Sequence, residues 1–203
     1  MPDITIGIQH MNSWSGSLID PVSNLYNRRI YLFTGITDDV VGVPPMDKHR
    51  EQLSVFADPE KLTYVLCGGA SHTFPTDSNA PGNSPCSQTA SPYISNCGYD
   101  GAGEVLKWMY GDLAARNDDT LTGHVLDFDQ SGSFVAEAMA STGYMYVPKA
   151  CQDGHLCKLH VALHGCRQSA GFIGTTFVNN TGYNKWAGKS SLCLKQQGKL
   201  ISF

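Results

Sequence analysis

Three short apolar runs, each followed within two residues by glycine and then by polar residues, constrain the fold of this chain more than any other feature. They occupy residues 29–34, 62–66 and 158–164. Their aromatic and β-branched residues predict buried strands, and the glycines that follow predict turns at the strand ends. Segments with helical spacing alternate with such strands along the chain. This alternation predicts an α/β fold, with helices packed around a mostly parallel sheet.

The segments between these runs have equally distinct patterns. Residues 46–56 and 104–113 have the spacing of core-facing helices, and residues 143–148 resemble another strand. Residues 73–96 are rich in Ser, Pro, Asn and Thr, which favours a long surface loop over a simple connection. No internal repeat is present.

Potentially catalytic residues follow each of the three runs. Asp38 comes after the first, His72 after the second and Gly165-Cys166 after the third. Open α/β sheets place their sites at the carboxyl ends of strands. An aspartate and a histidine there can act as the acid and base of a catalytic triad, and the backbone amide of Cys166 can stabilise an oxyanion. Asp39 is an equally good candidate acid on sequence alone.

Each of these assignments has a simpler alternative. Asp38 can be a turn or N-cap residue, and His72 can be an ordinary loop histidine. The Gly165-Cys166 pair can be a turn that ends a strand and carries a buried cysteine. The spacing of acid and base alone is therefore a weak signal, and the glycine-cysteine turn is a stronger one.

A serine nucleophile is missing from the pattern. The usual α/β-hydrolase order is oxyanion strand, serine elbow, acid and histidine, whereas here the oxyanion-like strand comes last. No Gly-x-Ser-x-Gly segment occurs in the sequence. Ser15 and Ser17 do not replace it, because Ser15 lacks both a preceding strand and the glycine two positions before it. The order predicts a circular permutation, with the nucleophile outside these residues.

A zinc site is the competing interpretation of the third region. Histidines and cysteines are dense there, and His160 and His164 lie on one face of the predicted strand. The spacing lacks the paired knuckles of structural zinc sites, and Cys151 offers Cys157 another partner. The candidate ligands are His155, Cys157, His160, His164 and Cys166.

Length and charge exclude several other classes of protein. The chain has 203 residues, enough for one domain with a sizeable core, and 41% of them are hydrophobic. Its formal net charge is −4 and it has no long basic run, which argues against a nucleic-acid partner. It has no apolar run of about 18 residues, so we expect no membrane span.

Seven cysteines point to an oxidising compartment. Cys86 and Cys97 lie in the polar loop, and Cys151 and Cys157 flank a short turn, so each pair resembles a disulfide staple. Residues 1–4 show no signal-peptide pattern, so either the chain is cytosolic or its beginning is missing. Asn179 begins a glycosylation sequon, which has meaning only in a secreted protein.

Several longer motifs together resemble fungal extracellular polyhydroxybutyrate depolymerases. The resemblance covers residues 2–187 and is highly specific. The motifs that carry it are Met11-Asn12-Ser13-Trp14-Ser15-Gly16, Ser71-His72-Thr73-Phe74-Pro75-Thr76-Asp77, Ser91-Pro92-Tyr93-Ile94-Ser95-Asn96-Cys97, Tyr99-Asp100-Gly101-Ala102-Gly103, Val161-Ala162-Leu163-His164-Gly165-Cys166 and Asn180-Thr181-Gly182-Tyr183-Asn184-Lys185-Trp186-Ala187.

The resemblance implies a single-domain, circularly permuted α/β-hydrolase that cleaves polyester or short-chain ester bonds through a Ser-His-Asp triad. The acid of that family falls on Asp38 rather than Asp39, and its base falls on His72. The amide of Cys166 corresponds to one oxyanion donor. The resemblance further implies a secreted monomer that needs no cofactor and binds polymer on an exposed surface beside a narrow crevice.

Two departures from the family pattern qualify this expectation. The serine elbow of the family lies ahead of the position of Met1, and residues 188–203 form a divergent tail without the remaining C-terminal strands. We therefore expect a partial hydrolase domain over residues 1–187, and for this chain either an inactive form or a remnant that at most binds polymer. Cys166 would lose its disulfide partner, while Cys67 and Cys193 have no obvious partners.

Overall fold

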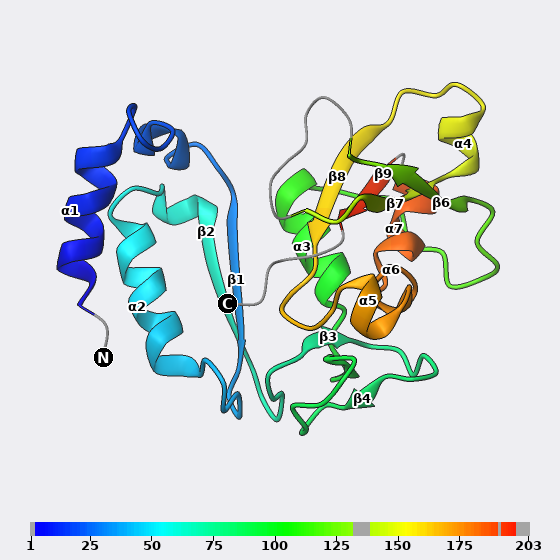
Figure 1. Ribbon diagram of the computed structural model, residues 1–203, viewed down its shortest axis with the longest axis horizontal. Coiled ribbons are helices and arrows are strands. Elements are labelled where there is room, and N and C mark those ends of the chain that lie inside the picture. Colours follow the sequence, from blue (N-terminus) through cyan, green and yellow to red (C-terminus); the bar gives the residue numbers. More distant parts are fainter. Residues whose placement is uncertain (1–2, 132–138, 191, 198–203) are drawn as a thin grey trace. The chain divides into compact units, whose positions relative to one another are not determined.

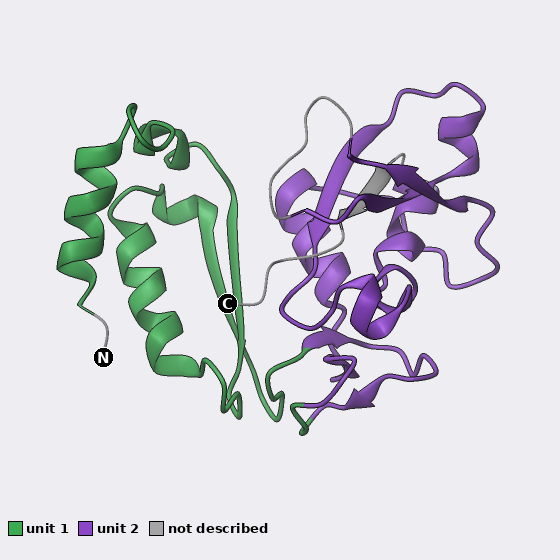
Figure 2. Cartoon of the chain, viewed as in Figure 1, with its two compact units in different colours: residues 1–73, 87–89 green, residues 74–86, 90–203 purple. Residues whose placement is uncertain are grey.

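The computed structural model describes residues 3–131, 139–190 and 192–197 of the chain. Side chains are not described for Lys189 or for residues 192–197. The chain divides into two compact units (Figure 2). Unit 1 comprises residues 1–73 and 87–89, and unit 2 comprises residues 74–86 and 90–203. Helices and strands occur in both, which confirms the predicted α/β content.

Unit 1 is built around two parallel strands, β1 (Ile30–Gly35) and β2 (Leu62–Cys67). Their register runs from Ile30 opposite Leu62 to Gly35 opposite Cys67, so both strands end at the same level. Helix α2 (Val43–Ser54) connects them and packs on both. Helix α1 (Ile4–Trp14) packs on α2, on the same side of the strands (Figure 1). Two short 3₁₀ helices, η1 (Val22–Leu25) and η2 (Pro59–Lys61), complete this unit.

The helices of unit 1 begin at sequence signals that explain their positions. Asp3 caps α1, because its carboxylate accepts a hydrogen bond from the backbone amide of Thr5 at 2.9 Å. Proline occupies the first turn of α2, where its missing N–H has no helical partner in any case. The predicted helix over residues 46–56 is therefore confirmed, but it begins three residues earlier and ends at Ser54.

Unit 2 contains two sheets. The smaller has the order β3-β5-β4, with β3 (Phe74–Thr76) and β4 (Ser84–Pro85) both parallel to β5 (Ile94–Asn96). The larger has the order β6-β7-β9-β8. Its strands are β6 (His124–Asp129), β7 (Thr142–Val147), β8 (Lys158–Leu163) and β9 (Leu192–Gln197). β7 is antiparallel to β6 and β9, whereas β8 and β9 are parallel.

Helices of unit 2 surround these strands. They are α3 (Gly101–Tyr110), α4 (Lys149–Gln152), α5 (Ala170–Ile173), α6 (Thr176–Asn180) and α7 (Tyr183–Ser190). The core of the unit joins residues from α3, β5, β7, β8, α6 and α7. Its buried members are Ile94, Ala102, Leu106, Tyr146, Ala162, Phe177, Tyr183, Trp186 and Ala187.

The C-terminal part of unit 2 bears on the predicted division of the chain. The predicted boundary between residues 187 and 188 falls inside α7. The predicted tail contributes β9, which pairs with both β7 and β8 and so joins the two sides of the larger sheet. Residues of this tail are therefore part of regular structure over 188–190 and 192–197.

Candidate active site

Asp38 and His72 lie in the two loops that follow β1 and β2. Because these strands are parallel neighbours in register, their loops leave the same end of the pair. The loops are also tied to each other: the backbone amide of Ile36 donates to the carbonyl of Cys67 at 2.9 Å. Thr37 donates to the carbonyl of Ala70 twice, from its amide at 3.1 Å and its hydroxyl at 2.8 Å.

Gly35 permits this close approach of the two loops. A β-carbon at this position would collide with the backbone carbonyl of Ala70 and approach that of Ser71. Because Gly35 is buried, the collision of an added β-carbon could not be relieved by shifting this residue towards solvent. The glycine that the sequence pattern placed at the end of the first strand is therefore required by packing against the second loop.

The side chains of Asp38 and His72 form a hydrogen-bonded pair. Nδ1 of His72 lies 2.9 Å from Oδ2 of Asp38. The other carboxylate oxygen, Oδ1, accepts the backbone amides of Val40 and Val41 at 2.9 and 3.0 Å. Since an ionised carboxylate only accepts hydrogen bonds, Nδ1 of His72 must carry the hydrogen. Nε2 is then the unprotonated nitrogen of the neutral ring, as a general base requires.

Burial differs sharply between the two members of the pair. The side chain of Asp38 is 8% exposed and that of His72 is 42% exposed. Burial raises the pKa of Asp38, but the hydrogen bonds from His72, Val41 and Val40 outweigh it, so the net pKa lies below the ordinary value. The acid is therefore held ionised beneath a ring that solvent and a substrate can reach.

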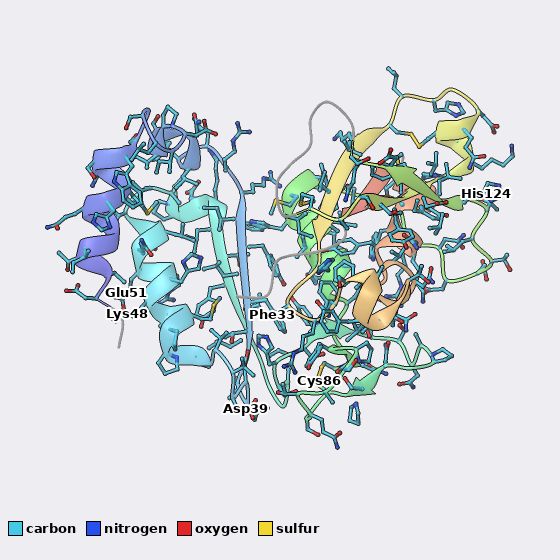
Figure 3. All side chains as sticks on the ribbon, viewed as in Figure 1. Phe33, Asp39, Lys48, Glu51, Cys86 and His124 are labelled. Atoms are coloured by element: carbon cyan, nitrogen blue, oxygen red, sulfur yellow. A yellow bond between two sulfur atoms is a disulfide. The ribbon has the colours of Figure 1, made fainter. Side chains whose placement is uncertain are left out.

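The neighbouring carboxylate, Asp39, has a different partner. Its Oδ1 accepts a hydrogen bond from the hydroxyl of Thr89 at 2.8 Å. Figure 3 labels Asp39 beyond the end of β1, in the same loop as Asp38. Of the two candidate acids, the structure brings only Asp38 to the ring of His72. Thr89 was not among the residues that the sequence singled out.

The turn after β8 belongs to unit 2 and contains Gly165 and Cys166. The amide of Gln168 donates to the carbonyl of Gly165 at 3.2 Å, and Arg167 has a positive φ of 58°. The side chain of Gln168 fixes this turn from within: its Oε1 accepts the amide of Gly165 at 2.9 Å, and its Nε2 donates to the carbonyls of Pro92 and Tyr93. Gln168 is a supporting residue that the sequence analysis missed.

The sequence of this chain is similar to those of known proteins over most of its length. No protein-family model matches the chain. A polyhydroxybutyrate depolymerase from Talaromyces funiculosus is 52% identical over 194 residues, which are 95% of this chain and 57% of that protein. A poly(3-hydroxybutyrate) depolymerase from Delftia acidovorans is 44% identical, over 90% of this chain and 37% of that protein. Close homologues of this chain are polyhydroxybutyrate depolymerases.

Solved structures of polyhydroxybutyrate (PHB) depolymerases show the same similarity. The crystal structure of PHB depolymerase from Penicillium funiculosum matches 98% of this chain and 63% of its own, with a TM-score of 0.94 and 50% sequence identity. A serine-to-alanine variant of PHB depolymerase, complexed with an R3HB trimer, matches 100% of this chain and 64% of its own, with the same TM-score and 49% identity. The chain thus spans less than two thirds of the length of these depolymerases.

The disulfides predicted from the sequence are both present in unit 2. Cys86 bonds to Cys97, and Cys151 bonds to Cys157. Cys67 is a buried free cysteine and Cys166 an exposed one. The side chain of Cys193 lies outside the described residues.

Most of the candidate zinc ligands make other contacts in the structure, and a disulfide removes one of them, Cys157, from the set. Nδ1 of His155 lies 3.0 Å from the carbonyl of Ala150. Nδ1 of His160 contacts the hydroxyl of Tyr110, at 3.1 Å. Within the described residues, no three metal-binding side chains gather into a group that could hold an ion.

Two further sequence expectations concern processing and location. Asn179, the sequon asparagine, is exposed in α6. The sequon threonine, Thr181, is 1% exposed, and its hydroxyl donates to the carbonyl of Phe177. Among the residues that the structure describes, no helix has the length and apolar character needed to cross a membrane.

Proposed function

We propose that this chain supplies the acid and base of a secreted serine esterase that hydrolyses polyhydroxybutyrate-type polyesters. The observation that carries the proposal is the 2.9 Å contact between Nδ1 of His72 and a carboxylate oxygen of Asp38. Asp38 is held by two backbone amides and the ring of His72 is half-exposed, as the acid and base of a triad need to be.

In this mechanism, Nε2 of His72 takes the proton of a serine hydroxyl as its oxygen attacks the ester carbonyl. The tetrahedral intermediate carries its negative charge on the former carbonyl oxygen, where the amide of Cys166 donates a hydrogen bond. His72 then protonates the departing hydroxyl group of the polyester, leaving an acyl-serine ester. Water, activated by Nε2, hydrolyses that ester and restores the serine.

The serine itself lies outside the printed sequence in this proposal, because no Gly-x-Ser-x-Gly segment is present. The order acid, base and oxyanion turn fits a circularly permuted α/β-hydrolase whose nucleophile strand precedes these residues. The chain covers 57% of the Talaromyces depolymerase, so a further segment of such a protein is consistent with the proposal.

The substrate class rests on the relatives. The solved structure of a PHB depolymerase of 49% identity is a complex with an R3HB trimer, so a short hydroxybutyrate ester is the natural probe for this chain. We propose that the protein acts on it as a secreted monomer without a cofactor. Its two disulfides support an oxidising environment.

The second candidate function is polymer binding without cleavage. The missing serine elbow favours it for the 203-residue chain alone. In that case Asp38 and His72 would be retained structure from a catalytic ancestor, and the chain would adsorb to polyester without releasing hydroxybutyrate.

The deciding experiment compares two proteins on the R3HB trimer. The first is the 203-residue chain, and the second is the product of the complete transcript, including any coding sequence upstream of Met1. We expect no turnover by the first and turnover by the second, reduced about 10⁶-fold by His72→Ala. His49→Ala, which removes an exposed histidine from α2, is the matched control and should leave the rate unchanged.

Other outcomes discriminate between the alternatives. Turnover by the 203-residue chain that disappears with His72→Ala would place a nucleophile inside the chain and contradict our assignment. Adsorption to polymer without hydrolysis by the complete product would support the binding function. Hydrolysis that is unaffected by His72→Ala would remove His72 from the mechanism.

A further inference from the structure

Thr89 connects two residues of the candidate site that are distant from it in sequence. Its hydroxyl donates a hydrogen bond to Oδ1 of Asp39 at 2.8 Å and accepts one from the backbone amide of His72 at 3.3 Å. A threonine hydroxyl has one hydrogen to donate and lone pairs to accept with. Because Asp39 takes that hydrogen, a lone pair remains to accept the amide of His72.

The segment that carries Thr89 belongs to unit 1. Residues 87–89 are assigned to that unit, although the residues on both sides of them belong to unit 2 (Figure 2). The disulfide between Cys86 and Cys97 closes the loop that contains this segment, which reduces the conformations open to it. Thr89 is half-buried, whereas Asp39 is exposed.

His72 is therefore held at two points by consecutive aspartates of one loop. Asp38 holds the ring directly through Nδ1. Asp39 holds the backbone amide indirectly, through the hydroxyl of Thr89. A ring fixed only at Nδ1 can still shift with its backbone, and small displacements of a catalytic group reduce the rate substantially.

We propose that Thr89 and Asp39 are positioning residues that fix the backbone of His72 and thereby hold its ring in contact with Asp38. The proposal rests on the proposed function, since it assigns a task to residues around the general base. It also explains why two adjacent carboxylates occur after β1: one orients the imidazole, and the other orients the hydroxyl that anchors the histidine backbone.

The test is nuclear magnetic resonance on the 203-residue chain, with two readings at His72. These are the exchange rate of its backbone amide and the signal of its Nδ1-bound proton. Thr89→Val keeps the shape of the side chain and removes the hydroxyl. We expect amide exchange to accelerate about fivefold, the factor for about 1 kcal/mol in one hydrogen bond, and the Nδ1 proton signal to be lost.

Three companion variants sharpen the result. Thr89→Ser restores the hydroxyl and should restore both signals. Asp39→Ala removes the acceptor that orients the hydroxyl and should act like Thr89→Val; because Asp39 is exposed, this variant decides the matter if Thr89→Val does not fold. Ser87→Ala changes an exposed hydroxyl in the same segment and should alter neither signal.

A merely structural role would accelerate amide exchange and leave the Nδ1 proton signal in place. That result, or unchanged signals in both Thr89→Val and Asp39→Ala, would overturn the proposal. The ester assay is a separate reading. Suppose that the product of the complete transcript does not hydrolyse the R3HB trimer, while the Thr89 and Asp39 variants show the predicted resonance changes. That result would contradict the proposed function and leave the positioning of His72 by Thr89 standing.

Discussion

The carboxylate of Asp38 accepts three hydrogen bonds, one from the ring of His72 and two from backbone amides. Burial raises its pKa, but these hydrogen bonds bring the net value below the ordinary 3.8. A carboxylate whose pKa is lower in the folded state stabilises the fold above its unfolded pKa. This stabilisation is lost as the pH falls through the pKa of Asp38 in the folded state, so the loss occurs below about pH 4.

We therefore predict that, as the pH is lowered, the free energy of unfolding falls less steeply in Asp38→Asn than in the unsubstituted chain. Denaturant unfolding at several values between pH 6 and pH 2 would measure it. Asp20→Asn removes the same charge from an exposed position and is the control. Parallel curves for the chain and Asp38→Asn would contradict the assigned shift.

Gly35 provides a second prediction at the scale of one residue. Gly35→Ala forces a methyl group against the carbonyl of Ala70, and we expect it to lower the free energy of unfolding by about 1–3 kcal/mol. Gly68→Ala is the control, because a β-carbon there meets nothing within 4 Å. Equal stability of both variants in denaturant unfolding would show that the two loops are not in close contact.

The sequence identifies some of these residues and not others for a physical reason. Asp38 and His72 could be predicted because each follows a strand, and parallel neighbours bring their following loops together. The pattern could not choose between Asp38 and Asp39, since the choice depends on which way two adjacent side chains turn. Thr89 lies 17 residues from His72 and 50 from Asp39, so only the folded chain reveals its contacts.

At the scale of elements, strands were easier to predict than helices. The runs that predicted β1, β2, β7 and β8 lie within a residue or two of the observed strands. α1 was not predicted, although its partly buried residues, Ile4, Gly7, Ile8 and Met11, recur with helical spacing. The residues of β6 are mostly exposed and include two aspartates, so that strand also lacks the apolar signal of a buried strand.

The start of α3 illustrates how one side chain can organise an element. Asp100 caps this helix by accepting the amide of Gly103 at 2.9 Å. Its other oxygen accepts hydrogen bonds from the indole of Trp186 at 2.9 Å and the guanidinium of Arg116 at 3.0 Å. The same arginine pairs with Asp77 and Asp118, so the cap joins α3 to the surrounding chain of unit 2.

We predict that Asp100→Ala destabilises unit 2 by about 2–3 kcal/mol. Loss of the helix cap accounts for about 1 kcal/mol, and the rest comes from the partly buried indole and guanidinium donors left without this acceptor. Asp119→Ala, at an exposed position nearby, should change stability by less than about 0.5 kcal/mol. Thermal or denaturant unfolding would compare them. Equal losses would show that Asp100 acts only through its charge.

At the scale of the whole molecule, the sequence predicted the α/β class and both disulfides, which the structure confirms. It did not predict two compact units, because that division depends on contacts between residues far apart in the chain. The contribution of β9 was also missed. The sequence of this polar, divergent segment shows little of the apolar pattern that predicts a strand. Its position in the sheet is determined by its pairing with β7 and β8.

The two disulfides offer a matched test of how constraint on one loop reaches the candidate site. Replacing Cys86 and Cys97 together by serine opens a loop of sequence separation 11, and replacing Cys151 and Cys157 opens one of 6. Loop-closure entropy predicts a loss of about 2–3 kcal/mol in each case. Only the first loop contains Thr89, so only its opening should accelerate amide exchange at His72. Equal acceleration in both double variants would indicate general loosening of the fold, whereas none in either would show that Thr89 holds its place without the disulfide.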